Sequence, residues 1–117
     1  MKEIVEALKK RISENKNSML VTVVAGRGPI PRKAGAYMVV GEDGRVTGTI
    51  GGGNLEYQAT LLGQKLLTEK KNYLHEYNLG QEKSAELGMA CGGNATVLFY
   101  FVDAREDAVF LCRTVFL

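Results

Sequence analysis

Three consecutive glycines constrain this chain more than any other feature. Gly51, Gly52 and Gly53 stand in the run TIGGGNLE, between a β-branched segment and an amphipathic one. Glycine adopts positive φ and lets another molecule approach the backbone without a Cβ in the way. A tight turn needs one glycine or two, so the third favours an open stretch of backbone at the start of a helix.

An open loop of this kind is suited to binding an anion. Successive amides in such conformations can point into one concavity. A helix that begins near Asn54 adds its free N–H groups and the positive end of its dipole. The pattern predicts a phosphate or pyrophosphate site, with Arg32 or Lys33 as the counter-charge. The competing interpretation is close packing of a helix against a strand at a tight corner.

Two well-known phosphate-binding motifs are excluded. The run GRGPIPR, residues 26–32, lacks the third glycine of the dinucleotide fingerprint, and Pro29 and Pro31 oppose a helix directly after the glycines. The glycine run lacks the Lys-Ser/Thr pair of a P-loop. What remains is a loop over 26–35, stiffened by its prolines, that could present Arg27, Arg32 and Lys33 to a ligand. The alternative is a basic loop that is merely solvated.

Glu56 lies in the first turn of the predicted helix. A carboxylate there meets the helix dipole favourably and caps free amides, which is the ordinary role. The second interpretation is an acid that faces a ligand and accepts hydrogen bonds from a heterocycle. The residues alone leave both open.

A second glycine cluster, GMACGGN, surrounds a cysteine: Gly92 and Gly93 directly follow Cys91. Exposed backbone amides favour a thiolate, which can attack a sulfur donor or bind a soft metal. The alternative is a buried structural cysteine in a tight turn. Cys112 is interpreted as a small apolar residue within an apolar segment. His75 is the only histidine of the sequence, so no histidine-based metal centre is expected.

The periodicity of the apolar residues predicts the elements of an α+β fold. Helices are predicted over 2–13 and 54–70, where apolar residues recur at helical spacing. Asp43-Gly44 predicts a hairpin turn between two strands. The fold class is therefore a single small domain with a mixed or antiparallel sheet of about five strands, packed by two main helices. The strands are predicted over 19–25, 36–40, 45–50, 72–79 and 95–102.

Composition narrows the classes of protein further. A net charge of +2 with no basic stripe argues against a nucleic-acid binder, and the basic cluster over 9–11 is expected on an exposed helix face. No apolar run approaches the roughly 20 residues of a membrane span. No signal peptide is visible, and two lone cysteines fit the reducing cytoplasm, so a cytoplasmic location without membrane contact is expected.

Three motifs follow one another along the chain: PRKAGA over 31–36, GTIGGGNLE over 48–56 and GMACGG over 88–93. Together they resemble the N-terminal domain of the XdhC/CoxI family, the xanthine dehydrogenase accessory factors. The resemblance is strongest over 18–104, and the tail 105–117 does not match. Full-length members usually continue into a Rossmann-like C-terminal domain, which the 117 residues do not include, so both a one-domain member and a truncated one stay open. The chain is thus expected to be one XdhC/CoxI N-terminal-like domain over 1–117.

The resemblance implies a chaperone that binds the molybdenum cofactor and inserts it into a xanthine dehydrogenase-type molybdenum hydroxylase. The implied partners are the hydroxylase apoenzyme, a second copy of the chain, a cysteine desulfurase and a separate Rossmann-domain chain. Arg32 and the triple glycine would hold the phosphate, and Cys91 would lie near the molybdenum. The implied cofactor-binding residues are Arg32, Gly51, Gly52, Gly53, Glu56, Cys91, Gly92 and Gly93.

Two other functions compete with the chaperone. The first is a sulfur-relay enzyme in which Cys91 carries a persulfide and is therefore catalytic. The second is a subunit-interaction module without a ligand, in which the glycines only permit tight packing. Of these, a non-catalytic maturation factor agrees best with the resemblance.

Overall fold

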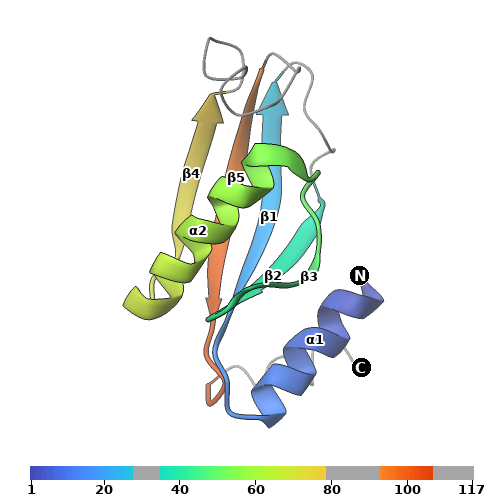
Figure 1. Ribbon diagram of the computed structural model, residues 1–117, viewed down its shortest axis with the longest axis vertical. Helices are drawn as coiled ribbons and strands as arrows, with labels where there is room; N and C mark the ends of the chain where they lie inside the picture. The colour runs from blue at the N-terminus through green and yellow to red at the C-terminus, as the bar shows by residue number, and fades with distance from the viewer. Residues whose placement is uncertain (28–34, 79–92, 107–117) are drawn as a thin grey trace.

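Two helices and five strands make up the described part of this computed structural model, residues 1–27, 35–78 and 93–106 (Figure 1). All neighbouring strands are antiparallel, in the order β3-β2-β1-β5-β4. The predicted α+β class is confirmed. The elements are α1 (Lys2–Ser13), β1 (Ser18–Arg27), β2 (Tyr37–Gly41), β3 (Gly44–Gly48), α2 (Gly53–Glu69), β4 (Tyr73–Asn78) and β5 (Asn94–Val102).

The predicted elements agree closely with the observed ones. The first helix has the predicted bounds, and β2 and β3 join at the predicted Asp43-Gly44 turn. β1 is longer than expected, because Gly26 and Arg27 pair with Ala95 and Asn94 instead of starting the loop. The sequence also favours a short helical turn over 81–87, a stretch that lies outside the described residues. Within the described ranges, neither helix is long and apolar enough to cross a membrane.

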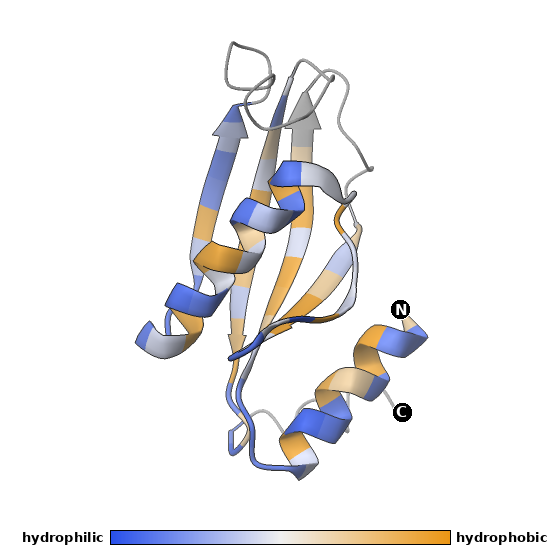
Figure 2. Ribbon diagram, viewed as in Figure 1, coloured by the Kyte–Doolittle hydropathy of each residue, from blue (hydrophilic) through white to orange (hydrophobic). Residues whose placement is uncertain are grey.

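The helices lie on opposite faces of the sheet. Alternate strand residues point to opposite faces, so Met38 and Val40 join the core under α2, while Val39 joins the cluster under α1. Figure 2 shows that most of β1 is apolar. α2 packs across the sheet through Leu55, Ala59 and Leu66, whereas α1 packs mainly against β2 and β3.

Arg11 corrects the prediction that residues 9–11 form an exposed basic face. Its side chain is buried, and its Nε donates to Ser18 Oγ at 2.7 Å. Its Nη2 donates to the carbonyl of Asn17 at 2.7 Å and pairs with Glu42 at 3.0 Å. The hydrogen bonds from Arg11 lower the pKa of Glu42. A buried guanidinium needs such partners, and together they join α1 to the start of β1 and to the β2–β3 hairpin.

Candidate functional site

The first and second motifs meet beside the N terminus of α1. Gly35 donates its N–H to the carbonyl of Val23 at 2.7 Å, and the carbonyl of Ala36 accepts from Val23 N–H at 3.3 Å. Thr49 of the second motif donates its N–H to the carbonyl of Tyr37 at 3.0 Å. The backbones on the two sides of β2 are thereby held close to one another.

An open cavity of about 430 Å³ lies where these motif ends meet. α1 contributes its first turn to the wall, and the two motifs contribute backbone and hydroxyl groups. The cavity places parts of both motifs on one surface, although they are separated in the sequence. Its lining comprises Met1, Glu3, Ile4, Gly35, Ala36, Tyr37, Thr47, Gly48 and Thr49.

The triple glycine forms open backbone at the start of α2, as predicted. The φ angles of Gly51, Gly52 and Gly53 are 127°, 75° and 64°, and the helix begins at Gly53. With ψ at −164°, Gly52 lies in a region that is essentially restricted to glycine. A Cβ on Gly52 would meet no non-neighbouring heavy atom within 4 Å among the described residues. Close packing therefore does not account for glycine at this position.

Gly48, by contrast, is required by packing. A Cβ there would lie 2.6 Å from Ile4 Cδ1 and 2.9 Å from Met38 Cα, and closer still to the carbonyl oxygen of Tyr37. The tight-corner interpretation thus applies to the glycine that ends β3. The backbone at Gly52 is accessible and can be approached by another molecule.

Glu56 holds the glycine loop in place. Its Oε1 accepts the N–H of Ile50 at 3.0 Å and the N–H of Gly52 at 3.1 Å. It also accepts the hydroxyl of Thr49, whose Oγ1 in turn accepts the N–H of Gly51 at 3.0 Å. The capping role predicted for Glu56 is confirmed, and a direct contact of this carboxylate with a ligand stays a prediction.

The carboxylate of Glu56 is charged at neutral pH. Burial raises its pKa, but the hydrogen bonds from Thr49, Ile50 and Gly52, together with Arg45, outweigh burial and lower the pKa below the ordinary value. Arg45 Nε lies 3.6 Å from Glu56 Oε2. The loop therefore already binds one anion, which is the side chain of its own helix.

The N–H groups of Gly51 and Gly52 are consequently used within the loop. An external anion would be left with the first-turn N–H groups of α2, at residues 53–55, which have no acceptor inside the helix. These groups also lie at the positive end of the helix dipole. The N–H groups that remain for an external anion thus lie about two residues further into the helix than the triple glycine on which the sequence placed the site.

The third motif reaches the same end of the sheet. Gly93, with φ at 147°, precedes Asn94, and Asn94 pairs with Arg27 on one side and Asn78 on the other. Figure 1 shows this end of β1, β4 and β5 on the side toward which α2 points its N terminus. Arg32, Cys91 and Gly92 lie outside the described residues, so their place beside the glycine loop stays a prediction.

Sequence reasoning missed two residues of the glycine loop. Thr49 links Gly51 to Glu56, because its hydroxyl accepts from the one and donates to the other. A hydroxyl residue two positions before the first glycine is the sequence signal that could have predicted this contact. Arg45 also donates to the carbonyl of Gly48 at 2.7 Å, a contact that only the hairpin geometry reveals. Within the described ranges, no three His, Cys, Asp or Glu residues are grouped to hold a metal ion.

Two curated proteins of Escherichia coli K12 are similar in sequence to most of this chain. In Escherichia coli K12, the molybdenum cofactor insertion chaperone PaoD is 30% identical over 95 residues, which cover 81% of this chain and 30% of PaoD. The uncharacterized protein YqeB of the same organism is 32% identical over 92 residues, covering 79% of this chain and 17% of YqeB. The chain thus spans less than a third of the curated relatives it matches.

A solved structure has the same fold. The crystal structure of a xanthine dehydrogenase from Bacillus halodurans matches with a TM-score of 0.70 and 28% identity, covering 93% of this chain and 35% of that one. The model of the XdhC and CoxI family matches residues 12–78, more than half of the chain. This match includes the glycine loop and Glu56. The chain belongs to the XdhC and CoxI family.

Proposed function

We propose that this chain binds the molybdenum cofactor and helps to insert it into a molybdenum hydroxylase of the xanthine dehydrogenase type. The observation that carries the proposal is the 30% identity to a molybdenum cofactor insertion chaperone over 81% of this chain. The chain spans only part of that relative, so the activity of the whole chaperone is proposed here for this domain.

The described residues fit the phosphate of such a cofactor. The backbone at Gly52 is open, and the N–H groups of residues 53–55 lie at the start of α2. Glu56 is already paired with Arg45, so a phosphate bound near this carboxylate calls for a cation of its own, and Arg32 of the first motif is proposed for that role. When bound, the cofactor supplies the molybdenum centre, and Cys91 is proposed to lie at that end because a thiolate suits a soft metal.

The comparisons support one of the proposed partners, a molybdenum enzyme, and the other partners are proposed from the sequence motifs. The client is the apoenzyme of a molybdenum hydroxylase, and the solved relative carries the description of a xanthine dehydrogenase. A second copy of this chain, a cysteine desulfurase and a separate Rossmann-domain chain complete the proposed set. We place this maturation step in the cytoplasm, where apoenzymes with reduced thiols are available.

Reconstitution of an apoenzyme tests the insertion role. The purified chain is loaded anaerobically with isolated molybdenum cofactor and mixed with a cofactor-free hydroxylase, and the rate of substrate oxidation is followed. We expect faster activation than with the same amount of free cofactor. Cys91→Ala should lower this activation, whereas Cys112→Ala, which removes the other thiol, should not.

Each outcome assigns the failure to a different part of the proposal. Activation no faster than with free cofactor would rule out insertion by this domain. Equal activation by the Cys91→Ala and Cys112→Ala variants would retain insertion and remove Cys91 from the site.

A further inference from the structure

Among the described strands, β4 lies at one edge of the sheet. It pairs with β5 through six consecutive residues without a register shift, and no strand of the described chain pairs with its other side. Such an edge exposes a row of backbone N–H and C=O groups to which another strand can add. Charged side chains, proline and bulges usually block an exposed edge, and of these β4, YLHEYN, carries one, the carboxylate of Glu76. At the other edge of the sheet, the β2–β3 ladder is interrupted by a register shift.

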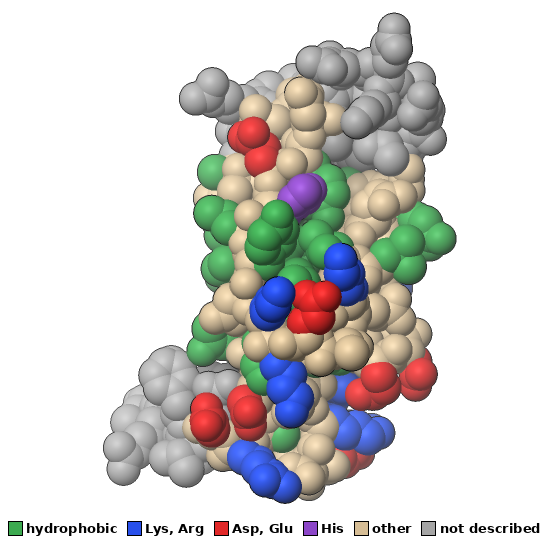
Figure 3. Space-filling model, turned by 90° about the vertical axis from the view of Figure 1, so that its left-hand side faces the viewer, with side chains coloured by type: hydrophobic (Ala, Val, Ile, Leu, Met, Phe, Trp, Pro, Cys, Tyr) green, Lys and Arg blue, Asp and Glu red, His purple; other side chains and the backbone are tan. Residues whose placement is uncertain are grey.

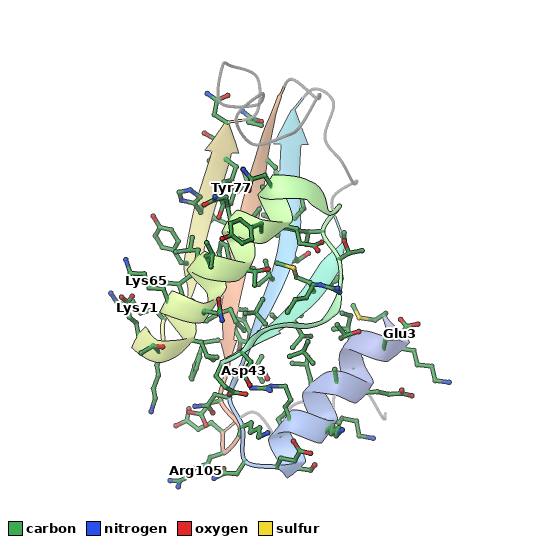
Figure 4. The ribbon with its side chains drawn as sticks, in the orientation of Figure 1. Glu3, Asp43, Lys65, Lys71, Tyr77 and Arg105 are labelled. Atoms are coloured by element: carbon green, nitrogen blue, oxygen red, sulfur yellow. The ribbon has the colours of Figure 1, made fainter. Side chains whose placement is uncertain are left out.

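An aromatic row follows this edge on the α2 side. The rings of Tyr73 and His75 are stacked with centroids 5.7 Å apart, and those of His75 and Tyr77 meet edge to face at 4.4 Å. Figure 3 views the molecule from this side and shows apolar side chains around the histidine, with lysine and glutamate below. In Figure 4, Lys65 and Lys71 lie beside the C-terminal half of α2, and Tyr77 lies between β4 and α2.

The row is symmetric about its middle residue. Tyr73, His75 and Tyr77 read the same in both directions, and residues that pair in an antiparallel sheet lie on the same face. A two-fold axis at His75 would place Tyr73 opposite Tyr77 of the partner subunit, which forms favourable cross-strand aromatic pairs. An axis at Glu76 would oppose two carboxylates, which is unfavourable. An isologous interface requires this kind of self-complementary surface, so the symmetry favours a second copy over an unrelated strand.

We propose that β4 pairs antiparallel with β4 of a second copy about a two-fold axis at His75. The two five-stranded sheets then continue into one sheet across the dimer. The motif-bearing ends of the two sheets point in opposite directions, so each copy keeps a site of its own. This inference rests on the homodimer of the proposed function and does not depend on cofactor binding.

Charge substitutions at the axis test this register. His75→Lys and His75→Glu each place like charges opposite one another, so each variant alone should raise the dimer Kd by up to about fivefold. An equimolar mixture of the two should return to dimers of nearly wild-type affinity, because the charges across the axis are then opposite. Sedimentation equilibrium of the full chain measures each Kd. Val46→Lys on β3, where the side chain is 43% exposed at the other edge, is the matched control and should leave the Kd unchanged.

Leu74→Lys provides an independent check. Its side chain is 59% exposed, so the variant is expected to fold. In the proposed register it faces Glu76 of the partner subunit, and the new ion pair should tighten the dimer. A general apolar contact would instead be weakened by this change.

The outcomes distinguish the interface from the rest of the account. Failure of the mixed His75 variants to associate, or weaker association of Leu74→Lys, would overturn the β4 interface while leaving a homodimer through another surface. A wild-type chain that stays monomeric would overturn both the interface and the proposed homodimer. Neither result would touch cofactor insertion, which the activation assay measures separately.

Discussion

Gly48 and Gly52 both have positive φ angles, but different physical reasons place glycine there. Gly48 lies against the Tyr37 carbonyl and Ile4, so any side chain would collide with backbone. Gly52 has open space at its Cβ position and a conformation that costs about 1–3 kcal/mol for other residues. At the residue scale, one glycine serves packing, and the other keeps the backbone accessible. Glu56 then fixes the accessible loop by accepting two of its N–H groups.

The capping by Glu56 predicts a pH-dependent contribution to stability. Because the folded-state pKa of Glu56 lies below its ordinary value of 4.5, its contribution is fully present above that pH and is lost as the pH falls through the folded pKa. Glu56→Gln should lower the free energy of unfolding by about 1.5–3 kcal/mol at pH 7, the range for hydrogen bonds to a charged group. The difference from wild type should shrink in acid.

Urea unfolding at neutral and acidic pH measures this effect. Glu6→Gln, at an exposed position of α1, is the control and should change little. A deficit of Glu56→Gln that is as large in acid as at pH 7 would show that charge on Glu56 does not hold the loop.

At the scale of elements, α1 depends on one buried cation. Arg11 links the helix to Ser18 at the start of β1 and to Glu42 in the β2–β3 turn. Helical periodicity correctly predicts the helix but places Arg11 on its exposed side. Its partner Glu42 is 31 positions away, so no local pattern could reveal the contact.

Replacing Arg11 should loosen α1 before it loosens the sheet. Arg11→Met leaves the buried Ser18 hydroxyl and the Asn17 carbonyl without this donor, at a cost of about 1–3 kcal/mol each. We expect faster native-state hydrogen exchange at the α1 amides, with protection of β1 and β5 retained. Lys10→Met, at an exposed neighbouring position, is the control. Equal acceleration in both variants, or in neither, would contradict the role assigned to Arg11.

The elements and their order in space were not equally predictable. The Asp43-Gly44 turn and the alternating strands are written in local sequence, so their bounds agree within a few residues. The insertion of β5 between β1 and β4 depends on pairing across more than 70 positions, such as Met19 with Phe101, which periodicity does not encode. The glycine loop was predicted to bind an anion, but only the structure reveals that Glu56 is the anion bound within the described chain.

At the scale of the whole molecule, the fold gathers motifs that are far apart in the sequence. The first and second motifs border one cavity, and Gly93 of the third lies at the end of the sheet toward which α2 points its N terminus. The proposed β4 interface lies along the sheet edge, away from the cavity-lining residues.

The molybdenum content of the purified chain tests the central claim most directly. Coexpressed with cofactor biosynthesis and purified anaerobically, the wild-type chain should retain molybdenum on the order of one atom per site. Gly52→Val should lose it, because a side chain would fill the open backbone. Gly44→Val is the matched control, since Gly44 also has positive φ but lies at the start of β3, away from the glycine loop in the sequence. The molybdenum content of each variant is measured on the folded fraction of the purified protein, so that loss of folding is not counted as loss of binding. Absence of molybdenum from the wild-type chain, or equal retention by Gly52→Val and wild type, would contradict the account.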